Sequence, residues 1–245
     1  MSILINGDCL EELKEIDDDS VDLIFCDLPY GQTSCKWDCC IDLGLFWIEV
    51  MRVKKLHTPI FMTTTTKFGV SLINSAPKKC PFRYDIVWVK SAAAGFLSAK
   101  KMPMRKHEMI YVFYEKLPFY DLSSHKHKFI KEETIIRKDK HTTAYGENIH
   151  HHNNQQKNGE SIYDPPLPNS MLEIKSTRGK HHSTEKPVAL MEWVLKYYSK
   201  EGDVVLDPTM GSGSTGVACK DMNRNFIGIE KDPEIYEVAV NRIEV

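Results

Sequence analysis

The chain lacks several features that would assign it at once. No apolar run is long enough to cross a bilayer, and a formal net charge of −2 over 245 residues does not mark the whole protein as a polyanion binder. The first residues lack the charged-then-apolar layout of a signal peptide. We therefore expect a cytoplasmic protein that does not enter a membrane and whose seven cysteines are reduced thiols.

Cysteine pairs of the zinc-binding kind are also missing. Cys35, Cys39 and Cys40 form the only cysteine cluster, but their spacing is not C-x-x-C and no second pair follows. We interpret them as small buried or loop thiols. No metal site is expected.

The remaining sequence has the alternation of an α/β protein. Its 42% apolar and 27% charged residues are ordinary for a globular chain, and its length allows one large α/β domain with an insertion or two small domains. Strand and helix patterns alternate, which predicts a mostly parallel sheet of seven strands covered by helices on both faces. Strands are predicted at 3–6, 21–26, 60–64, 85–89, 109–114, 204–206 and 226–229, and helices at 10–16, 43–55, 68–75, 188–199, 215–222 and 233–243.

Residues 118–180 interrupt this alternation. They hold most of the histidines, a basic run at 126–140 and a proline-rich piece at 164–168, and their hydrophobic periodicity is weak. We interpret the segment as an inserted, partly irregular subdomain. Composition alone leaves a disordered loop as the alternative.

The strand predicted at 21–26 runs directly into Asp27-Leu28-Pro29-Tyr30. A carboxylate, a turn fixed by proline and an aromatic ring can together hold a planar amine. The carboxylate and a neighbouring backbone carbonyl accept its two N–H bonds, and the ring stacks on its face. This tetrapeptide is our candidate catalytic group.

A second candidate site follows the strand predicted at 204–206. Asp207 ends that strand, and the loop Pro208-Thr209-Met210-Gly211-Ser212-Gly213-Ser214-Thr215 leads into a helix. Glycines let a ligand approach the backbone, and helix starts favour carboxylates or phosphates. Glu230 ends the next strand about 20 residues on, the spacing of a ribose-binding acid in doubly wound folds. The loop lacks the Lys-Ser/Thr ending of a P-loop, but a dinucleotide ligand stays open.

These segments together resemble the amino-group DNA methyltransferases that use S-adenosylmethionine. Asp27–Tyr30 is similar to the catalytic tetrapeptide of that family, usually Asp-Pro-Pro-Tyr, from which Leu28 departs. The segment 182–187, His-Ser-Thr-Glu-Lys-Pro, resembles the motif before the cofactor strand, and His107-Glu108 matches a weaker signature. The order, with the tetrapeptide first and the glycine loop last, is that of the β group. It implies a Rossmann-like sheet that is circularly permuted.

The resemblance also implies roles along the chain. Residues 1–117 and 181–245 would be the catalytic and cofactor halves of one methyltransferase domain, and 118–180 an inserted target-recognition region. Cofactor contacts would come from Asp27, from Asp207 and the loop after it, and from Glu230 with its neighbour Lys231. By resemblance, Asp8 and Cys9 would meet the adenine ring of the cofactor, and Lys186, with Thr184 and Pro187 beside it, the methionine carboxylate.

The expected reaction is methylation of the N6 amino group of adenine in DNA after the base is flipped out of the duplex. By resemblance, enzymes acting on cytosine N4 more often carry Ser at position 27. The partners expected are DNA and, because enzymes of this group often pair, a second copy of the chain. The residues leave open a cytosine-N4, RNA or protein-amide methyltransferase, and a binding protein without catalysis. The basic runs 100–107 and 126–140 are either phosphate contacts or solvated faces.

Overall fold

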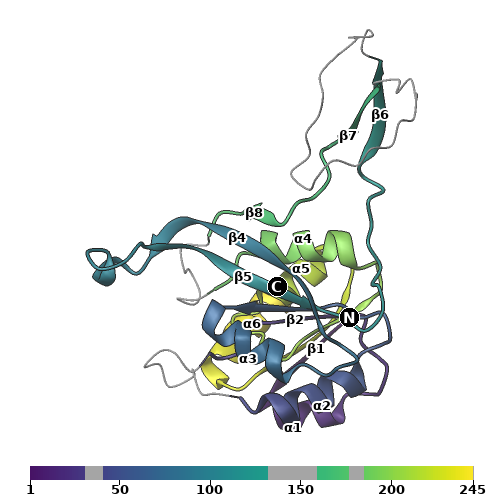
Figure 1. The fold of residues 1–245 in the computed structure, drawn as a ribbon. Coiled ribbons are helices and arrows are strands. Elements are labelled where there is room, and N and C mark those ends of the chain that lie inside the picture. The colour runs from purple at the N-terminus through teal and green to yellow at the C-terminus, as the bar shows by residue number, and fades with distance from the viewer. Residues whose placement is uncertain (31–40, 132–158, 177–184, 245) are drawn as a thin grey trace. The chain divides into compact units, whose positions relative to one another are not determined.

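The strands of the main domain form one sheet with a mostly parallel arrangement (Figure 1). The computed structural model describes residues 1–30, 41–131, 159–176 and 185–244. The strands of this sheet are β1 Ser2–Asn6, β2 Leu23–Cys26, β3 Ile60–Thr64, β4 Phe82–Ala94, β5 Arg105–Phe113, β8 Met171–Glu173, β9 Val204–Asp207 and β10 Asn225–Glu230. Their order is β1-β10-β9-β2-β3-β5-β4-β8, and β5 alone runs antiparallel to its neighbours.

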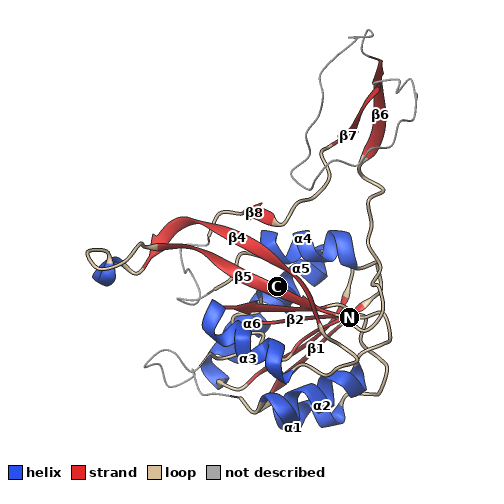
Figure 2. Ribbon diagram, viewed as in Figure 1, coloured by secondary structure: helices blue, strands red, loops and turns tan. Residues whose placement is uncertain are grey.

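Helices cover both faces of the sheet, as the alternation predicted (Figure 2). They are α1 Cys9–Glu12 continued by the 3-10 turn η1 Leu13–Glu15, α2 Leu43–Val53, α3 Thr66–Ser75, α4 Val188–Tyr198, α5 Ser214–Asp221 and α6 Pro233–Glu244. Side chains alternate along β2: Ile24 and Cys26 belong to the core cluster formed with α2 and α3, whereas Leu23 and Phe25 adjoin Met191 on α4. Burial on both faces explains why this strand reads as a continuous apolar run.

The prediction of seven strands was wrong by one. The eighth strand, β8, lies in the stretch interpreted as irregular and pairs in parallel with Val87–Val89 of β4. Only Leu172 of its three side chains is buried, so hydrophobic pattern carries almost no signal there. Backbone hydrogen bonding builds this edge strand, beginning with the bond from Val87 N–H to the Ser170 carbonyl, 2.7 Å long.

The sheet order creates a switch point between β9 and β2. From β9 the chain passes through α5 to β10 on one side, and from β2 it passes through α2 to β3 on the other. Ile24 pairs with Leu206, so Asp207, the last residue of β9, and Asp27, the first residue after β2, both lie at the carboxyl ends of adjacent parallel strands. Ligands of open α/β sheets bind at such a point.

Residues Leu122–Pro168 form a second compact unit, and the remaining described residues form the first. The described part of this second unit is a two-stranded antiparallel ribbon of β6 Lys126–Lys131 and β7 Gly159–Asp164. Its side chains contact across the strands through an ion pair of Lys128 with Asp164 and rings of His127 and Tyr163 whose centres are 5.0 Å apart. The cysteine cluster at 35–40 and most of the basic run 126–140 lie outside the described residues.

Within the described ranges, helices are all too short or too polar to cross a membrane. In the same ranges, His, Cys, Asp and Glu side chains form no group of three that could hold a metal ion. The four cysteines described there, Cys9, Cys26, Cys80 and Cys219, are free and buried.

Candidate functional site

Asp27 leaves β2 at its carboxyl end, where three side chains from elsewhere hold its carboxylate. The hydroxyl of Tyr30 donates to Oδ1 at 2.8 Å, the hydroxyl of Thr63 on β3 donates to the same oxygen, and the ammonium of Lys186 donates to Oδ2. Burial would raise the pKa of Asp27, but Lys186 and the two hydroxyls outweigh burial and lower that pKa. The carboxylate is therefore ionised at neutral pH.

Lys186 is the buried cation of this cluster. Its ammonium also lies 3.6 Å from Oε2 of Glu108, whose other oxygen pairs with Lys90. Burial would lower the pKa of Lys186, but Asp27 and Glu108 together raise it. Lys186 was expected to meet the methionine carboxylate of a cofactor. In the structure its partners are the two protein carboxylates, although it also lines the cavity described below.

The other members of the tetrapeptide have separate positions. Leu28 is buried in the hydrophobic core, so its side chain contributes packing, and Pro29 lines the cavity. The ring of Tyr30 packs on Phe68, with centroids 5.2 Å apart, while its hydroxyl holds Asp27. Hydrogen bonding to the carboxylate is thus a role of Tyr30 that the sequence did not predict.

The glycine loop turns sharply between β9 and α5. Gly211 and Gly213 have φ angles of 52° and 82°, in the left-handed region that favours glycine. A Cβ on Gly211 would point into open space, whereas one on Gly213 would lie 2.9 Å from Cδ1 of Ile243 on α6. Only Gly211 of these two lines the cavity. Gly213 instead allows α6 to pack closely on the loop.

Asp207 is buried beneath this loop and shapes it. One carboxylate oxygen accepts the N–H of Thr209 at 3.1 Å, and the other accepts the hydroxyl of Thr215 at 2.5 Å. Burial, aided by the charges of Asp27 and Glu230, raises the pKa of Asp207 to about 7 despite these two bonds. The carboxyl therefore titrates near neutral pH and would be stabilised in its charged form by a cation.

Glu230 closes the other side of the loop. Its oxygens accept the N–H of Gly211 at 3.0 Å and the N–H of Asp232 at 2.8 Å. Burial raises its pKa, and those backbone donors oppose the rise. Each oxygen keeps a further lone pair for ligand hydroxyls, so the expected ribose contact is compatible with the geometry.

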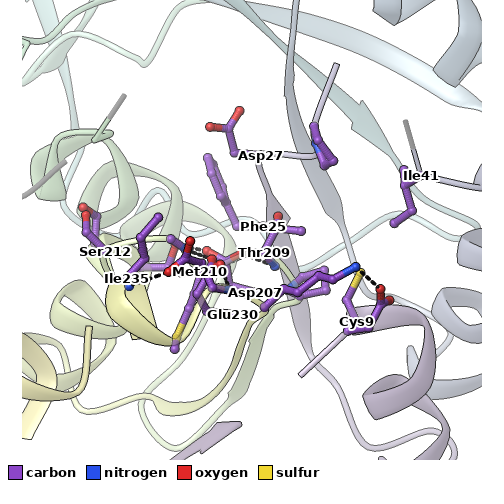
Figure 3. A pocket seen from close by; sticks show the side chains of 18 of the residues that line it. Cys9, Phe25, Asp27, Ile41, Asp207, Thr209, Met210, Ser212, Glu230 and Ile235 are labelled. Carbon is purple, nitrogen blue, oxygen red and sulfur yellow. Dashed lines mark hydrogen bonds and ion pairs between the residues drawn. The ribbon is translucent and has the colours of Figure 1, made fainter. Parts of the chain in front are cut away.

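Cys9 begins α1 and lies on the opposite side of the cavity from Ser212 (Figure 3), and Asp8 is the N-cap of the same helix. Asp8 caps the helix through the N–H of Leu10 and pairs with Lys231 at 2.9 Å. Burial raises the pKa of the Cys9 thiol to about 12, so the thiol stays protonated. Neither nucleophilic nor metal chemistry is indicated for it.

One cavity of about 600 Å³ joins these groups. Its size suits a small-molecule ligand. The residues expected from the sequence that line it are Asp8, Cys9, Asp27, Pro29, Lys186, Asp207, Pro208, Thr209, Gly211, Ser212, Ser214, Thr215, Glu230 and Lys231. Leu28, Tyr30, Pro187 and Gly213 are not in the lining, and Thr184 lies outside the described residues.

Sequence reasoning missed a further part of the lining. It comprises Gly7, Leu10, Phe25, Ile41, Asp42, Glu185, Met191, Asp232, Pro233 and Ile235, whereas Met210, which also lines the cavity, belongs to the predicted loop. Phe25 could have been predicted from the sequence, because it lies two residues before Asp27 and therefore points to the same face of the sheet. Ile41 and Met191 carried no such signal, since they reach the cavity from distant segments.

The lining has a definite chemical character. It contains seven carboxylates against two lysines, Lys186 and Lys231. Two buried hydroxyls in it, those of Thr209 and Ser214, have no hydrogen-bond partner in the described structure. An acidic lining repels a diphosphate, which disfavours the dinucleotide alternative. It suits a ligand that carries positive charge and has polar groups to satisfy the two hydroxyls.

The chain resembles proteins whose activities are named. It is 28% identical to the type II methyltransferase M.HinfI of Haemophilus influenzae over 99% of this chain and 68% of that protein. It is 29% identical to the DNA adenine methyltransferase YhdJ of Escherichia coli K12, over 99% and 82% of the two chains.

Solved structures share its fold. The complex of M1.HpyAVI with SAM matches with a TM-score of 0.63 and 22% identity, covering 99% of this chain and 100% of the other. The cytosine-N4-specific PvuII DNA methyltransferase matches with a TM-score of 0.69 and 15% identity, covering 98% and 86%. Residues 21–241 also match the family model described as DNA methylase, and the chain therefore belongs to the DNA methylase family.

Proposed function

We propose that this protein transfers a methyl group from S-adenosylmethionine to the N6 amino group of adenine in DNA. One observation carries the proposal: an ionised carboxylate, Asp27, opens on the same cavity as the glycine loop and Glu230. An amine held by Asp27 and a ligand held by the loop would therefore meet in one space.

The cavity fits S-adenosylmethionine by its chemistry. That molecule is cationic at its sulfonium centre and carries ribose hydroxyls, and the lining is rich in carboxylates. We assign the ribose to Glu230 and the polar groups near the loop to Thr209 and Ser214, whose buried hydroxyls lack partners. When bound, S-adenosylmethionine supplies an electrophilic methyl group.

The residues of the chain prepare the acceptor nitrogen. An exocyclic amino group is a poor nucleophile because its lone pair is delocalised into the base. Asp27 and a backbone carbonyl beside it, of Leu28 or Pro29, would accept its two N–H bonds and stabilise the positive charge that grows on nitrogen. Stabilisation of this kind is usually the largest catalytic effect. Lys186, Thr63 and Tyr30 keep the carboxylate charged and oriented.

Adenine is preferred to cytosine as the acceptor for two reasons. A carboxylate stands at position 27, and YhdJ, similar over 99% of this chain, is named a DNA adenine methyltransferase. The target base is inaccessible inside a duplex and would be extruded into the site. Tyr30 would then stack its ring on the face of the extruded base.

Three further parts of the proposal concern the surroundings of this reaction. We assign target recognition to the insert 118–180, which lies between the two halves of the methyltransferase domain. We also propose that the protein is a homodimer, which sedimentation of the purified protein would test. We further propose that it is cytoplasmic, because DNA is its substrate and its cysteines are reduced thiols.

The deciding experiment incubates the protein with unmethylated duplex DNA and S-adenosylmethionine, and identifies the digested nucleosides by mass spectrometry. N6-methyladenine is the expected product. N4-methylcytosine would keep the fold and the role of Asp27 but overturn the choice of base. Cofactor binding without any methylated base in DNA would direct the search to RNA or protein acceptors, and Asp27→Asn serves as the inactive control.

A further inference from the structure

Strands β4 and β5 continue beyond the sheet as a two-stranded ribbon (Figure 1). Val89 pairs with His107, and after an irregularity Ala94 pairs with Arg105. Residues 91–107 are exposed along this ribbon except for Ser98, which is partly buried. An isolated two-stranded ribbon is at best marginally stable in water, since it has no core. Its length and exposure indicate that something covers it during function.

The tip of the ribbon, residues 95–104 between the two strands, presents apolar side chains on a turn. Gly95 has a φ of 92°, and the 3-10 turn η2 Phe96–Ser98 follows. Its backbone is satisfied by bonds from Ser98 N–H to the Gly95 carbonyl and from Ala99 N–H to the Phe96 carbonyl, each 3.0 Å long. Phe96 and Leu97 are 80% and 100% exposed. Adjacent apolar side chains held in water on an ordered turn mark an interaction surface.

The charge of the same segment selects an anionic partner. Lys100, Lys101, Arg105 and Lys106 lie on the returning part of the ribbon, and residues 91–107 contain no Asp or Glu. The whole chain has a net charge of −2, so this is a local concentration of positive charge. A partner that is anionic outside and apolar inside complements both the positive charge of this segment and the exposed Phe96 and Leu97. Duplex DNA, with phosphates around a base stack, has that character.

The base of the ribbon touches the candidate active site. Glu108 follows the ribbon on β5 and contacts Lys186, which in turn contacts Asp27. Between the pairs Val89–His107 and Ala94–Arg105, β5 advances by only two residues, so the paired part of the ribbon extends by about 7 Å, at about 3.3 Å per residue, before the turn at its end. A two-stranded ribbon fits the major groove of B-DNA, about 12 Å wide. A duplex with one nucleotide near Asp27 therefore lies within reach of the tip.

We propose that the tip of the β4–β5 ribbon is a wedge for duplex DNA. Its cations hold phosphates, and Phe96 and Leu97 enter the base stack beside the nucleotide that leaves it. Apolar side chains inserted between base steps unstack them and keep the duplex distorted. This inference rests on the proposed function, because it gives the wedge the task of assisting base extrusion.

The test compares Phe96→Ala/Leu97→Ala with a matched control, Leu45→Ala/Ile48→Ala, which removes two exposed apolar side chains from α2. Two duplexes carry the methylation site mapped on genomic DNA, one fully paired and one with an abasic position opposite the target adenine. The wedge variant should lose at least about tenfold in kcat/KM on the paired duplex and regain most of it on the abasic duplex, where extrusion is easier. The control should match the wild type on both.

The phosphate contacts are tested by Lys100→Ala/Lys101→Ala against Lys78→Ala/Lys79→Ala, an exposed lysine pair after α3. Duplex affinity is measured by fluorescence anisotropy across a salt series. The tip variant should lower the slope of log affinity against log salt by up to about 1.8, at about 0.9 for each phosphate contact. The Lys78/Lys79 variant should keep the wild-type slope.

Several outcomes overturn the wedge. One is a loss of kcat/KM that is equal on the paired and abasic duplexes, and another is wild-type activity and affinity in both tip variants. Binding to phosphatidylglycerol vesicles that depends on Phe96 and Leu97, with duplex affinity unchanged, would assign the tip to a lipid surface. A wild type that methylates no DNA overturns the proposed function, while unchanged anisotropy in the tip variants still decides against the wedge.

Discussion

The ammonium of Lys186 lies against Oδ2 of Asp27 and 3.6 Å from Oε2 of Glu108, so one buried cation serves two carboxylates. The Lys186–Asp27 pair joins residues 159 positions apart in sequence. The charge of the proposed catalytic carboxylate therefore depends on Lys186, which lies shortly before α4 and the strand β9 that carries Asp207. Acceptor and cofactor segments are coupled through this contact.

Removing the carboxylate of Asp27 should stop the reaction without preventing S-adenosylmethionine from binding. For Asp27→Ala we expect a loss of about 10²–10³-fold or more in kcat, by analogy with deletion of one group that stabilises transition-state charge. Binding of S-adenosylmethionine, measured by calorimetry, should stay within a fewfold of the wild type. A comparable loss of cofactor affinity would sink the role assigned to Asp27.

Replacing Lys186 should change the pH dependence of the reaction. In the wild type the pKa of Asp27 is lowered, so activity should persist below neutral pH. In Lys186→Met, burial and the charge of Glu108 act without the opposing cation, and the acid limb of kcat against pH should move upward. Lys186→Arg should restore part of the original profile. A uniform loss at every pH, with the limb unmoved, would indicate a role in packing alone.

Asp207 makes the stability of the protein dependent on pH. Its folded pKa of about 7 lies above the ordinary value of 3.8, so between these pH values the folded state holds a proton that the unfolded chain has released. This contribution to the free energy of unfolding is present below pH 4 and is lost as pH rises to about 7. Asp207→Asn removes the buried charge, and its thermal midpoint should exceed that of the wild type at pH 8.

The same comparison at pH 5 supplies the control for Asp207→Asn. Only the first part of this contribution has been lost at pH 5, so the midpoint of the wild type should lie nearer to that of Asp207→Asn there than it does at pH 8. A constant difference between the proteins from pH 5 to pH 8 would contradict the raised pKa. Cofactor must be absent from both series, because a cationic ligand stabilises the folded state separately.

Gly216 should be required by packing. A Cβ there would lie 2.3 Å from Cδ1 of Ile243 and 2.8 Å from Cε1 of Phe226. Gly216→Ala should destabilise the protein by about 1–3 kcal/mol, as overpacked cores do. Ile243→Val removes the nearest atom, so in urea unfolding the double variant should lose less than the sum of the single variants. Strict additivity would show that Ile243 does not limit the space.

The site residues that lie at the ends of strands could be predicted from the sequence. Asp27, Asp207 and Glu230 each follow an apolar run, and parallel strands bring their carboxyl ends together. Contacts between distant segments could not be predicted. The pairing of Lys186 with Asp27 joins residues 159 positions apart, and no local pattern encodes such a contact.

The ribbon shows a second reason for incomplete prediction. Strand patterns end at Val89 on one side and begin at Met109 on the other, since period-2 burial stops there. Beyond them the strands continue through Ser91, the alanines and a basic stretch, none of which alternates in hydrophobicity. Backbone pairing alone maintains the ribbon, and a sequence carries little record of it.

The strand order has a consequence for the making of the protein. The C-terminal strands β9 and β10 lie between β1 and β2, and the hydrogen bond from Val204 N–H to the Asp22 carboxylate spans 182 residues. A chain emerging from the ribosome has β1 and β2 long before the strands that separate them. Until β9 and β10 have been made, β1 and β2 lack the strands that pair with them, which favours late and slow completion of the sheet. Fragments ending before residue 204 should therefore be insoluble or bound by chaperones, and the cell acquires a working methylation site only once residues 204–245 have been made.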